Sequence, residues 1–208
     1  MRSAVLIVLV SATAAADPGG IETSAEMSGG IAAGSTNGTN SMSGTVSAAA
    51  TLGLGVGYSF SPRTSGGLFL EYGLGDAPEQ SCVGCGYTIT SSVRVLRAGL
   101  YGRRRYGDLV AGVRAGYEEL DVTYGGFGSE NHDSWRGIEL LRPEVGYAVY
   151  DDQRLKIVFF AAASLGMFEY RATNGRGAWL GDQMSDMPNG PALHVWLMVG
   201  TRLGFRAF

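Results

Sequence analysis

The sequence of 208 residues carries a formal net charge of −3 at pH 7, and 45% of its residues are hydrophobic. With Lys156 as its only lysine, it has no polycationic stretch of the kind that binds nucleic acid, so no nucleic-acid partner is expected. Its 33 glycines disfavour helices and favour turns and closely packed strands.

The first 16 residues have the three parts of a secretory signal peptide. Met1-Arg2 gives a positive start, residues 4–10 form an apolar run, and Ala14-Ala15-Ala16 completes a small-residue cleavage pattern before Asp17. The apolar run is shorter than the about 20 residues that a membrane-spanning helix needs, and no later segment reaches that length. We therefore expect a signal peptide over residues 1–16 and a single domain over residues 17–208. The alternative is a buried N-terminal strand or helix.

An alternation of apolar and small or polar residues predicts eight strands in residues 17–208. In Thr45–Phe60 every even position from Val46 onward is apolar, whereas the odd positions hold Gly, Ala, Ser and Thr. Strands of roughly ten residues have the length that crosses a bilayer, about 9–11 residues, rather than the about 5–6 of soluble proteins. The other seven segments with this alternation are Ile21–Ile31, Leu68–Gly75, Leu96–Tyr101, Leu109–Glu118, Leu141–Val149, Leu155–Arg171 and Leu193–Arg206.

The connections between these segments alternate between long and short. Long and short connections alternate in this way in outer-membrane barrels, which have short periplasmic turns and long extracellular loops. The predicted fold is all-β, an eight-stranded antiparallel up-and-down transmembrane β-barrel. The short connections are Ser61–Ser65, Gly102–Gly107 and Asp151–Arg154, and the long ones are Gly34–Ser43, Asp76–Thr90, Thr123–Trp135 and Ala172–Pro191.

The composition of the two faces indicates which one meets lipid. A soluble, lipocalin-like barrel would turn the apolar face inward and expose the polar face to water. Here the polar face is mostly Gly, Ala and Ser, with isolated charges of both signs, whereas a solvated surface usually carries many Lys and Glu. We therefore expect a lipid-facing apolar surface and a packed polar interior. The predicted interior charge network comprises Glu22, Glu26, Glu71, Arg97, Arg114, Glu118, Arg142, Glu144 and Arg202.

Aromatic residues gather near the short connections and the C-terminus. This clustering predicts an aromatic girdle at one membrane interface. Its predicted members are Tyr58, Phe60, Tyr101, Tyr147, Tyr150, Phe205 and Phe208.

The signal peptide, the eight amphipathic strands, the alternating connections and a last strand that ends in Phe208 (GTRLGFRAF) together resemble one known group of proteins. They are similar to the small outer-membrane β-barrel superfamily of Gram-negative bacteria, which includes OmpA-like transmembrane domains, OmpX and the opacity-type porin family. The resemblance implies a monomer in contact with outer-membrane lipid, whose C-terminal strand is read by the barrel assembly machinery. It implies a structural or surface-interaction role of the extracellular loops, with an extracellular partner left unidentified, and no cofactor or enzymatic activity.

Two cysteines suggest a disulfide, and a His, Ser and Glu near one another in the sequence suggest an alternative function. Cys82 and Cys85 (CVGC) predict a short-range disulfide in an exported loop, because no other Cys or His in that loop could complete a metal site. His132, Ser134 and Glu139 are similar to the catalytic set of outer-membrane lipid A deacylases. An outer-membrane lipid A-modifying hydrolase is therefore one alternative function, and a narrow channel along the interior charges is another.

Overall fold

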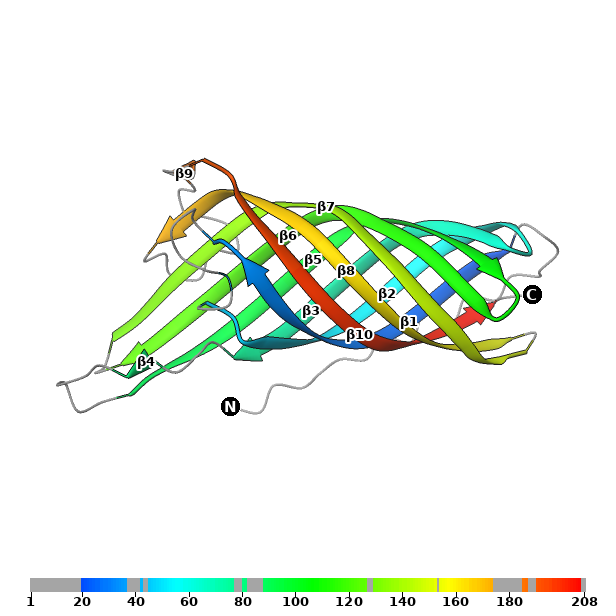
Figure 1. The fold of residues 1–208 in the computed structure, drawn as a ribbon, viewed down its shortest axis with the longest axis horizontal. Coiled ribbons are helices and arrows are strands. Elements are labelled where there is room, and N and C mark those ends of the chain that lie inside the picture. The colour runs from blue at the N-terminus through cyan, green and yellow to red at the C-terminus, as the bar shows by residue number, and fades with distance from the viewer. Residues whose placement is uncertain are drawn as a thin grey trace.

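Eight long antiparallel strands close into a barrel in the computed structural model of the protein (Figure 1). The structure describes residues 20–36, 42, 45–76, 80–81, 88–126, 129–152, 154–173, 185–186 and 190–206. The expected signal peptide, the two cysteines and Phe208 lie outside the described residues. The barrel strands are β1 (Ile21–Gly34), β2 (Ala48–Ser61), β3 (Thr64–Asp76), β5 (Thr88–Tyr106), β6 (Leu109–Gly126), β7 (Ser129–Asp151), β8 (Leu155–Thr173) and β10 (Ala192–Arg206).

Each barrel strand pairs with its neighbours in chain order, and the last strand returns to the first. The register of β1 and β10 runs from Glu22 opposite Arg206 to Gly34 opposite His194, which closes the sheet. Closure removes the free sheet edges that an open sheet would expose. Two short strands, β4 (Gln80–Ser81) and β9 (Ser185–Asp186), pair with β5 and β8. The prediction of an all-β, eight-stranded antiparallel up-and-down barrel is confirmed. Among the described residues no helix is long and apolar enough to cross a membrane.

Two predicted connections are wrong because the strands continue through them. Thr123–Trp135 is a paired hairpin rather than a long loop: β6 runs to Gly126 and β7 begins at Ser129. Residues 102–106 of the expected turn belong to β5, and the turn itself is at residues 107–108, where Gly107 has a φ of +63°. In both places the backbone pairing between neighbouring strands continues, although the polar side chains there suggested a loop.

The barrel is uneven at its loop side. Strands β5, β6, β7 and β8 have 18 to 23 residues, whereas β1, β2, β3 and β10 have 13 to 15. The loop-side ends of β5 to β8 are called the tall wall below, and β5, β6 and β7 are seen reaching past their neighbours at the end where β4 lies (Figure 1). The opposite, turn side holds the short connections. There the backbone N–H groups of Leu155 and Arg154 donate to Asp152 Oδ1 at 2.6 and 2.7 Å, which lowers the pKa of the Asp152 carboxyl.

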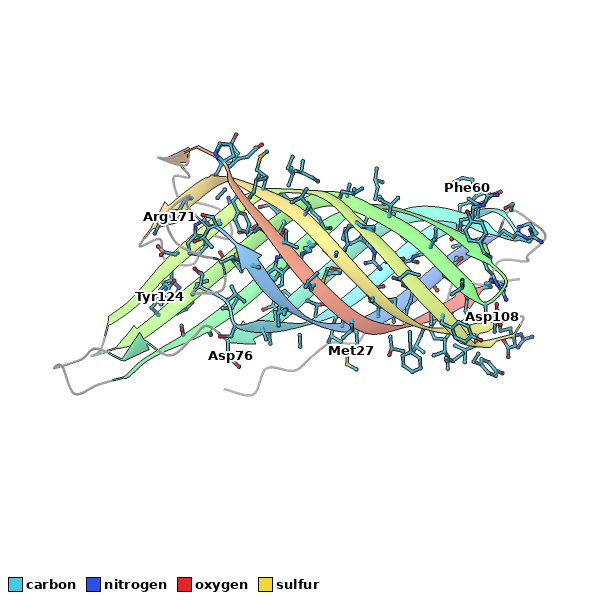
Figure 2. The ribbon with its side chains drawn as sticks, in the orientation of Figure 1. Met27, Phe60, Asp76, Asp108, Tyr124 and Arg171 are labelled. Carbon is cyan, nitrogen blue, oxygen red and sulfur yellow. The ribbon has the colours of Figure 1, made fainter. Side chains whose placement is uncertain are left out.

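The outward face is apolar around the circumference of the barrel. Large apolar side chains point away from every barrel strand, as Met27 and Phe60 do in Figure 2. Aliphatic surface of this extent is unfavourable in water and favourable in a hydrocarbon layer. The most exposed of these side chains are Met27, Leu52, Phe60, Leu100 and Val199.

Inward glycines let neighbouring strands and interior side chains approach closely. Gly99 of β5 lies opposite Gly116 of β6, and a Cβ built on Gly99 would stand 2.6 Å from the Gly116 Cα. A Cβ on Gly53 would stand 2.8 Å from the Glu26 Cγ. The small inward residues therefore provide the space that long charged side chains occupy.

Candidate functional site

The middle of the barrel is filled by five glutamates and five arginines, which we call the interior ion network. The side chains come from six of the eight barrel strands, and their formal charges sum to zero. All are buried, with at most 7% of any side chain exposed. Buried charges are stable only when they are paired and hydrogen-bonded. The network comprises Glu26, Glu71, Arg97, Arg103, Arg114, Glu118, Glu139, Arg142, Glu144 and Arg202.

Arg114 of β6 lies at the centre of the interior ion network. Its guanidinium donates to Glu26 Oε2 at 2.6 Å, to Glu144 Oε2 at 3.1 Å and to Glu71 Oε1. These three carboxylates belong to β1, β7 and β3, so one side chain of β6 connects four strands of the barrel. Such charge-assisted hydrogen bonds are stronger than neutral ones.

Glu71 of β3 also binds a second arginine, Arg142 of β7. Arg142 Nη1 and Nη2 donate to the two carboxylate oxygens of Glu71 at 2.8 and 2.9 Å, a bidentate pair. Arg142 Nε also lies 3.3 Å from Glu139 Oε1, and Ser164 Oγ donates to the same oxygen at 2.5 Å. Arg97 belongs to the same network through Glu118: its Nε and Nη2 donate to Glu118 Oε1 at 3.1 and 2.9 Å.

The network also ties the first strand to the last. Arg202 of β10 donates to Glu26 Oε2 and to Glu144 Oε2, both at 2.7 Å. Arg103 of β5 adds a bond to Glu144 Oε1 at 3.0 Å. Among the described residues no group of three or more His, Cys, Asp and Glu is placed to hold a metal ion.

Aromatic rings lie against the guanidinium planes. Arg114 and Arg142 stand 5.2 and 5.1 Å from the ring centroid of Phe69, and Arg202 stands 4.7 Å from that of Phe160. Cations are attracted to ring faces within about 6 Å. Inward Phe69 and Phe160 therefore pack against the guanidinium groups of the interior ion network.

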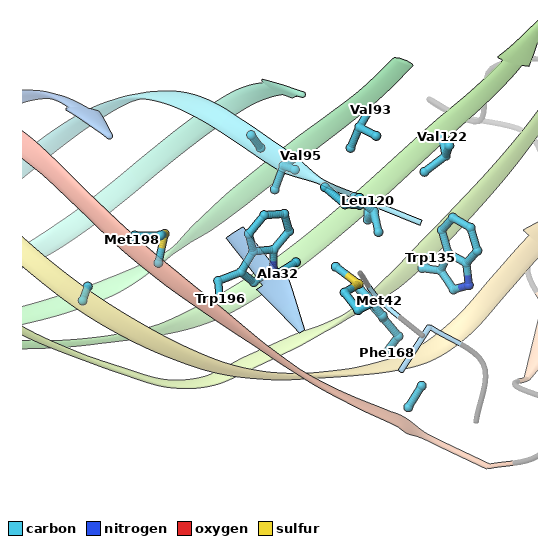
Figure 3. Close-up of a cluster of buried hydrophobic side chains, with 14 of the residues drawn as sticks. Ala32, Met42, Val93, Val95, Leu120, Val122, Trp135, Phe168, Trp196 and Met198 are labelled. Atoms are coloured by element: carbon cyan, nitrogen blue, oxygen red, sulfur yellow. The ribbon is translucent and has the colours of Figure 1, made fainter. Parts of the chain in front are cut away.

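Toward the loop side the interior changes from ionic to apolar, and Figure 3 shows the cluster of buried hydrophobic side chains found there. Met42, from the connection between β1 and β2, inserts among inward side chains of the barrel strands and is fully buried. The carbonyl of Met42 accepts hydrogen bonds from the N–H groups of Thr45 and Val46 at 3.0 and 2.8 Å, which form a local turn. This loop-side apolar cluster includes Ala32, Met42, Val46, Val93, Val95, Leu120, Val122, Trp135, Phe168 and Trp196.

His194 lies at the boundary between the interior ion network and the loop-side apolar cluster. Its ring stacks on Phe168 with centroids 4.0 Å apart, and its Nε2 lies 2.8 Å from Glu118 Oε2. Arg97 likewise spans the boundary, since it binds Glu118 and stands 4.8 Å from the ring centroid of Trp196. The interior side chains therefore form two zones that meet at His194 and Arg97, with charges in the middle and a hydrophobic cap toward the loops.

Comparison with solved structures identifies this architecture. Neisserial surface protein A has a TM-score of 0.52 at 12% sequence identity, and the match covers 90% of this chain and 97% of that one. A major outer membrane protein from Thermus thermophilus has a TM-score of 0.51 at 12% identity, covering 89% and 99%. This is the fold of the small outer-membrane β-barrels. No protein-family model and no curated protein matches the sequence of this outer-membrane-type barrel.

The nine predicted interior charges all lie on the inner side of the outer-membrane-type barrel. Glu22 stands apart from the network, near the turn side, where Ser59 Oγ donates to it at 3.5 Å. The sequence reasoning missed Arg103, because the predicted strand ended before it. It assigned Glu139 to the hydrolase set, outside the predicted strand, and extending the alternation back from Leu141 would place Glu139 on the outer face. A register shift between Glu139 and Leu141 reverses that alternation.

The interior is less polar than expected. The prediction of a packed polar interior holds for the middle of the barrel but is wrong for the loop-side half, which the apolar cluster fills. A signal was present in the sequence, since Trp196 and Met198 share the alternation of inward Arg202.

The predicted girdle residues separate into two groups. Tyr58, Phe60, Tyr147, Tyr150 and Phe205 are exposed on the outer face near the turn side. Tyr101 does not belong with them, because it is buried inside the barrel with the Arg103 guanidinium 4.0 Å from its ring centroid.

Each residue of the predicted hydrolase set has a partner outside the set. Ser134 Oγ donates to Asp121, and His132 Nδ1 lies 2.9 Å from Thr123 Oγ1. Glu139 is buried in the interior ion network, where it binds Ser164 and Arg142. The carboxylate that would orient a catalytic histidine is therefore committed elsewhere.

Proposed function

We propose that the chain is an integral outer-membrane protein of a Gram-negative bacterium. It spans the bilayer as a sealed barrel, acts without catalysis, and has a structural or surface-interaction role through its loop side. The observation that carries this proposal is a closed barrel with an apolar outer face and a charge-neutral, densely paired interior.

The distribution of outward residues supports a membrane-spanning position. Aromatic side chains stand near the turn side, aliphatic ones occupy the middle, and outward Tyr117 and Tyr170 lie toward the loop side. Beyond Tyr117 the outer face of the tall wall becomes polar, with Arg136 Nη2 bound to Glu119 Oε1 at 3.0 Å. Interfacial aromatic residues on either side of an aliphatic band are typical of transmembrane barrels.

The interior favours a seal over a channel. A conducting path would need water alongside the charges, whereas the interior ion network neutralises itself and the loop-side apolar cluster covers it. An eight-stranded barrel has an interior that side chains can fill. The tall wall then offers the surface on which an extracellular partner would bind, and the C-terminal strand β10 offers the segment that assembly machinery would read.

The proposal is tested by electrophoresis and conductance. Membrane fractions extracted in detergent are run on SDS gels with and without boiling, and the purified protein is added to planar bilayers. We expect a heat-dependent mobility shift and no steady single-channel conductance. A protein found in the soluble fraction without a shift would mean that the faces are inverted, and stable conductance would mean that the interior is a channel.

Orientation is tested by labelling in intact cells. A Cys82→Ser/Cys85→Ser background carries either Thr123→Cys on the tall wall or Asp108→Cys at a turn. A membrane-impermeant maleimide should label the first and not the second. Labelling at Asp108→Cys alone would reverse the proposed orientation.

A further inference from the structure

Two shallow grooves interrupt the outward apolar face. The first, called the turn-side groove, crosses β3, β5 and β6 near their turn-side ends and has a volume of about 740 Å³. Its floor is made by Gly66, Gly102 and Ala111, and Phe60, Leu68 and Leu100 stand beside it. Phe60, Leu68 and Leu100 are among the exposed large apolar side chains of the barrel. The groove therefore lies between bulky residues on the surface that faces lipid.

Gly102 is not required by the packing of the barrel. A Cβ built on the inward Gly99 or Gly116 would collide with the opposite backbone, at 2.2 Å from a carbonyl oxygen in both cases. A Cβ built on Gly102 meets nothing within 4 Å. A larger residue would fit at this position and would fill the groove.

The guanidinium group of Arg104 lies at the turn-side end of the groove. Arg104 is exposed, two residues from Gly102 on the same face of β5, and its guanidinium stands 5.4 Å from the ring centroid of Tyr106. Its neighbours Arg103 and Arg105 bind Glu144 and Asp151. Among the described residues no carboxylate lies within ion-pair distance of Arg104, so its charge is free for an external anion.

We propose that the turn-side groove binds one glycerophospholipid, with an acyl chain against Gly102 and the headgroup phosphate on Arg104. The proposal rests on the membrane location proposed above, which places the short turns and this groove in the periplasmic leaflet. Arginine and phosphate form charge-assisted hydrogen bonds, and the stack on Tyr106 holds the guanidinium at the level of the interfacial aromatic residues.

The second groove serves as an internal comparison. It has a volume of about 790 Å³, and its lining includes Gly29, where a built Cβ lies no nearer than 4.0 Å to any atom. Its lining also includes Asp76 and no arginine. A carboxylate repels phosphate, so this groove is not expected to select anionic lipid.

Native mass spectrometry of the folded protein in detergent measures the lipid that remains bound. The two probes are phosphatidylglycerol and a diacylglycerol with the same acyl chains but no phosphate. We expect wild type to retain phosphatidylglycerol about fivefold more than diacylglycerol, the effect of one arginine near an anionic lipid. Arg104→Gln should abolish this preference, Arg104→Lys should keep most of it, and Gly102→Leu should reduce retention of both lipids.

Matched variants separate this site from general effects. Gly29→Leu fills the second groove, and Arg94→Gln removes an outward arginine at the loop side; both should retain phosphatidylglycerol as wild type does. The proposal is overturned if Arg104→Gln and Gly102→Leu also retain it, or if the two controls lose it equally. Each variant is checked for the heat-dependent shift, so that only folded barrels are compared. A wild type that shows no shift would overturn the membrane location as well, whereas unselective retention by a folded wild type would overturn the lipid site alone.

Discussion

Removing the charge of Glu71 should destabilise the barrel more than any change to a surface ion pair. Glu71 accepts two hydrogen bonds from Arg142, at 2.8 and 2.9 Å, and a third from Arg114. In Glu71→Gln the side chain keeps its size, but its amide nitrogen cannot accept a hydrogen bond and the negative charge is lost. Two buried guanidinium groups then lose part of their compensation.

The expected cost is about 3 kcal/mol. Breaking a buried ion pair by removing one partner costs about 3–5 kcal/mol, and the glutamine oxygen recovers part of that. The matched control is Glu119→Gln, which breaks the partly exposed pair with Arg136 on the tall wall. Surface pairs contribute about 0–1 kcal/mol, so this variant should remain close to wild type.

Urea unfolding in phospholipid vesicles, followed by tryptophan fluorescence, measures the free energy of unfolding of each variant. The interior Trp135 and Trp196 report on barrel integrity. The double variant Glu71→Gln/Arg142→Met removes a negative and a positive charge together and should lose less stability than the sum of the single variants. If Glu71→Gln costs no more than Glu119→Gln, the interior ion network does not stabilise the barrel and our reasoning is refuted.

Three further outcomes follow from the geometry. Met42→Ala should lower the free energy of unfolding by about 2 kcal/mol in the same vesicle assay, because it opens a cavity in the loop-side apolar cluster. Gly99→Val should prevent the heat-dependent shift on SDS gels, because its side chain collides with β6, whereas Gly102→Val on the same strand should keep the shift. Ser134→Ala should leave the lipid A pattern of the host unchanged by mass spectrometry, and an altered pattern would restore the hydrolase hypothesis.

The alternation of residue types predicted the strands and the direction of most side chains. It succeeded because a strand has a strict period of two and because large apolar residues gather on one face of each strand. The same rule explains Tyr101: it shares the alternation of inward Arg97 and Gly99, and this outweighs its closeness to the turn. Proximity to a turn is therefore a weaker guide to a girdle position than strand periodicity.

What the sequence could not provide was the register, since pairing depends on contacts between distant segments. The register shifts in β7 place both Leu140 and Leu141 on the outer face and return Glu139 to the interior. Nothing in the local sequence marks that bulge. The insertion of Met42 into the barrel was also beyond prediction, because a single apolar residue in a polar connection has no periodic pattern.

The interior ion network also constrains the order in which the chain can fold. Glu26 and Arg202 are 176 positions apart in the chain, yet they share a hydrogen bond that forms only when β1 meets β10. Until then Arg114 and Glu144 lack some of their partners. In the outer membrane proposed above, a partly closed sheet would therefore carry uncompensated charge into hydrocarbon. Insertion and final closure should therefore be kinetically coupled, with few stable intermediates between an unfolded chain and a finished barrel.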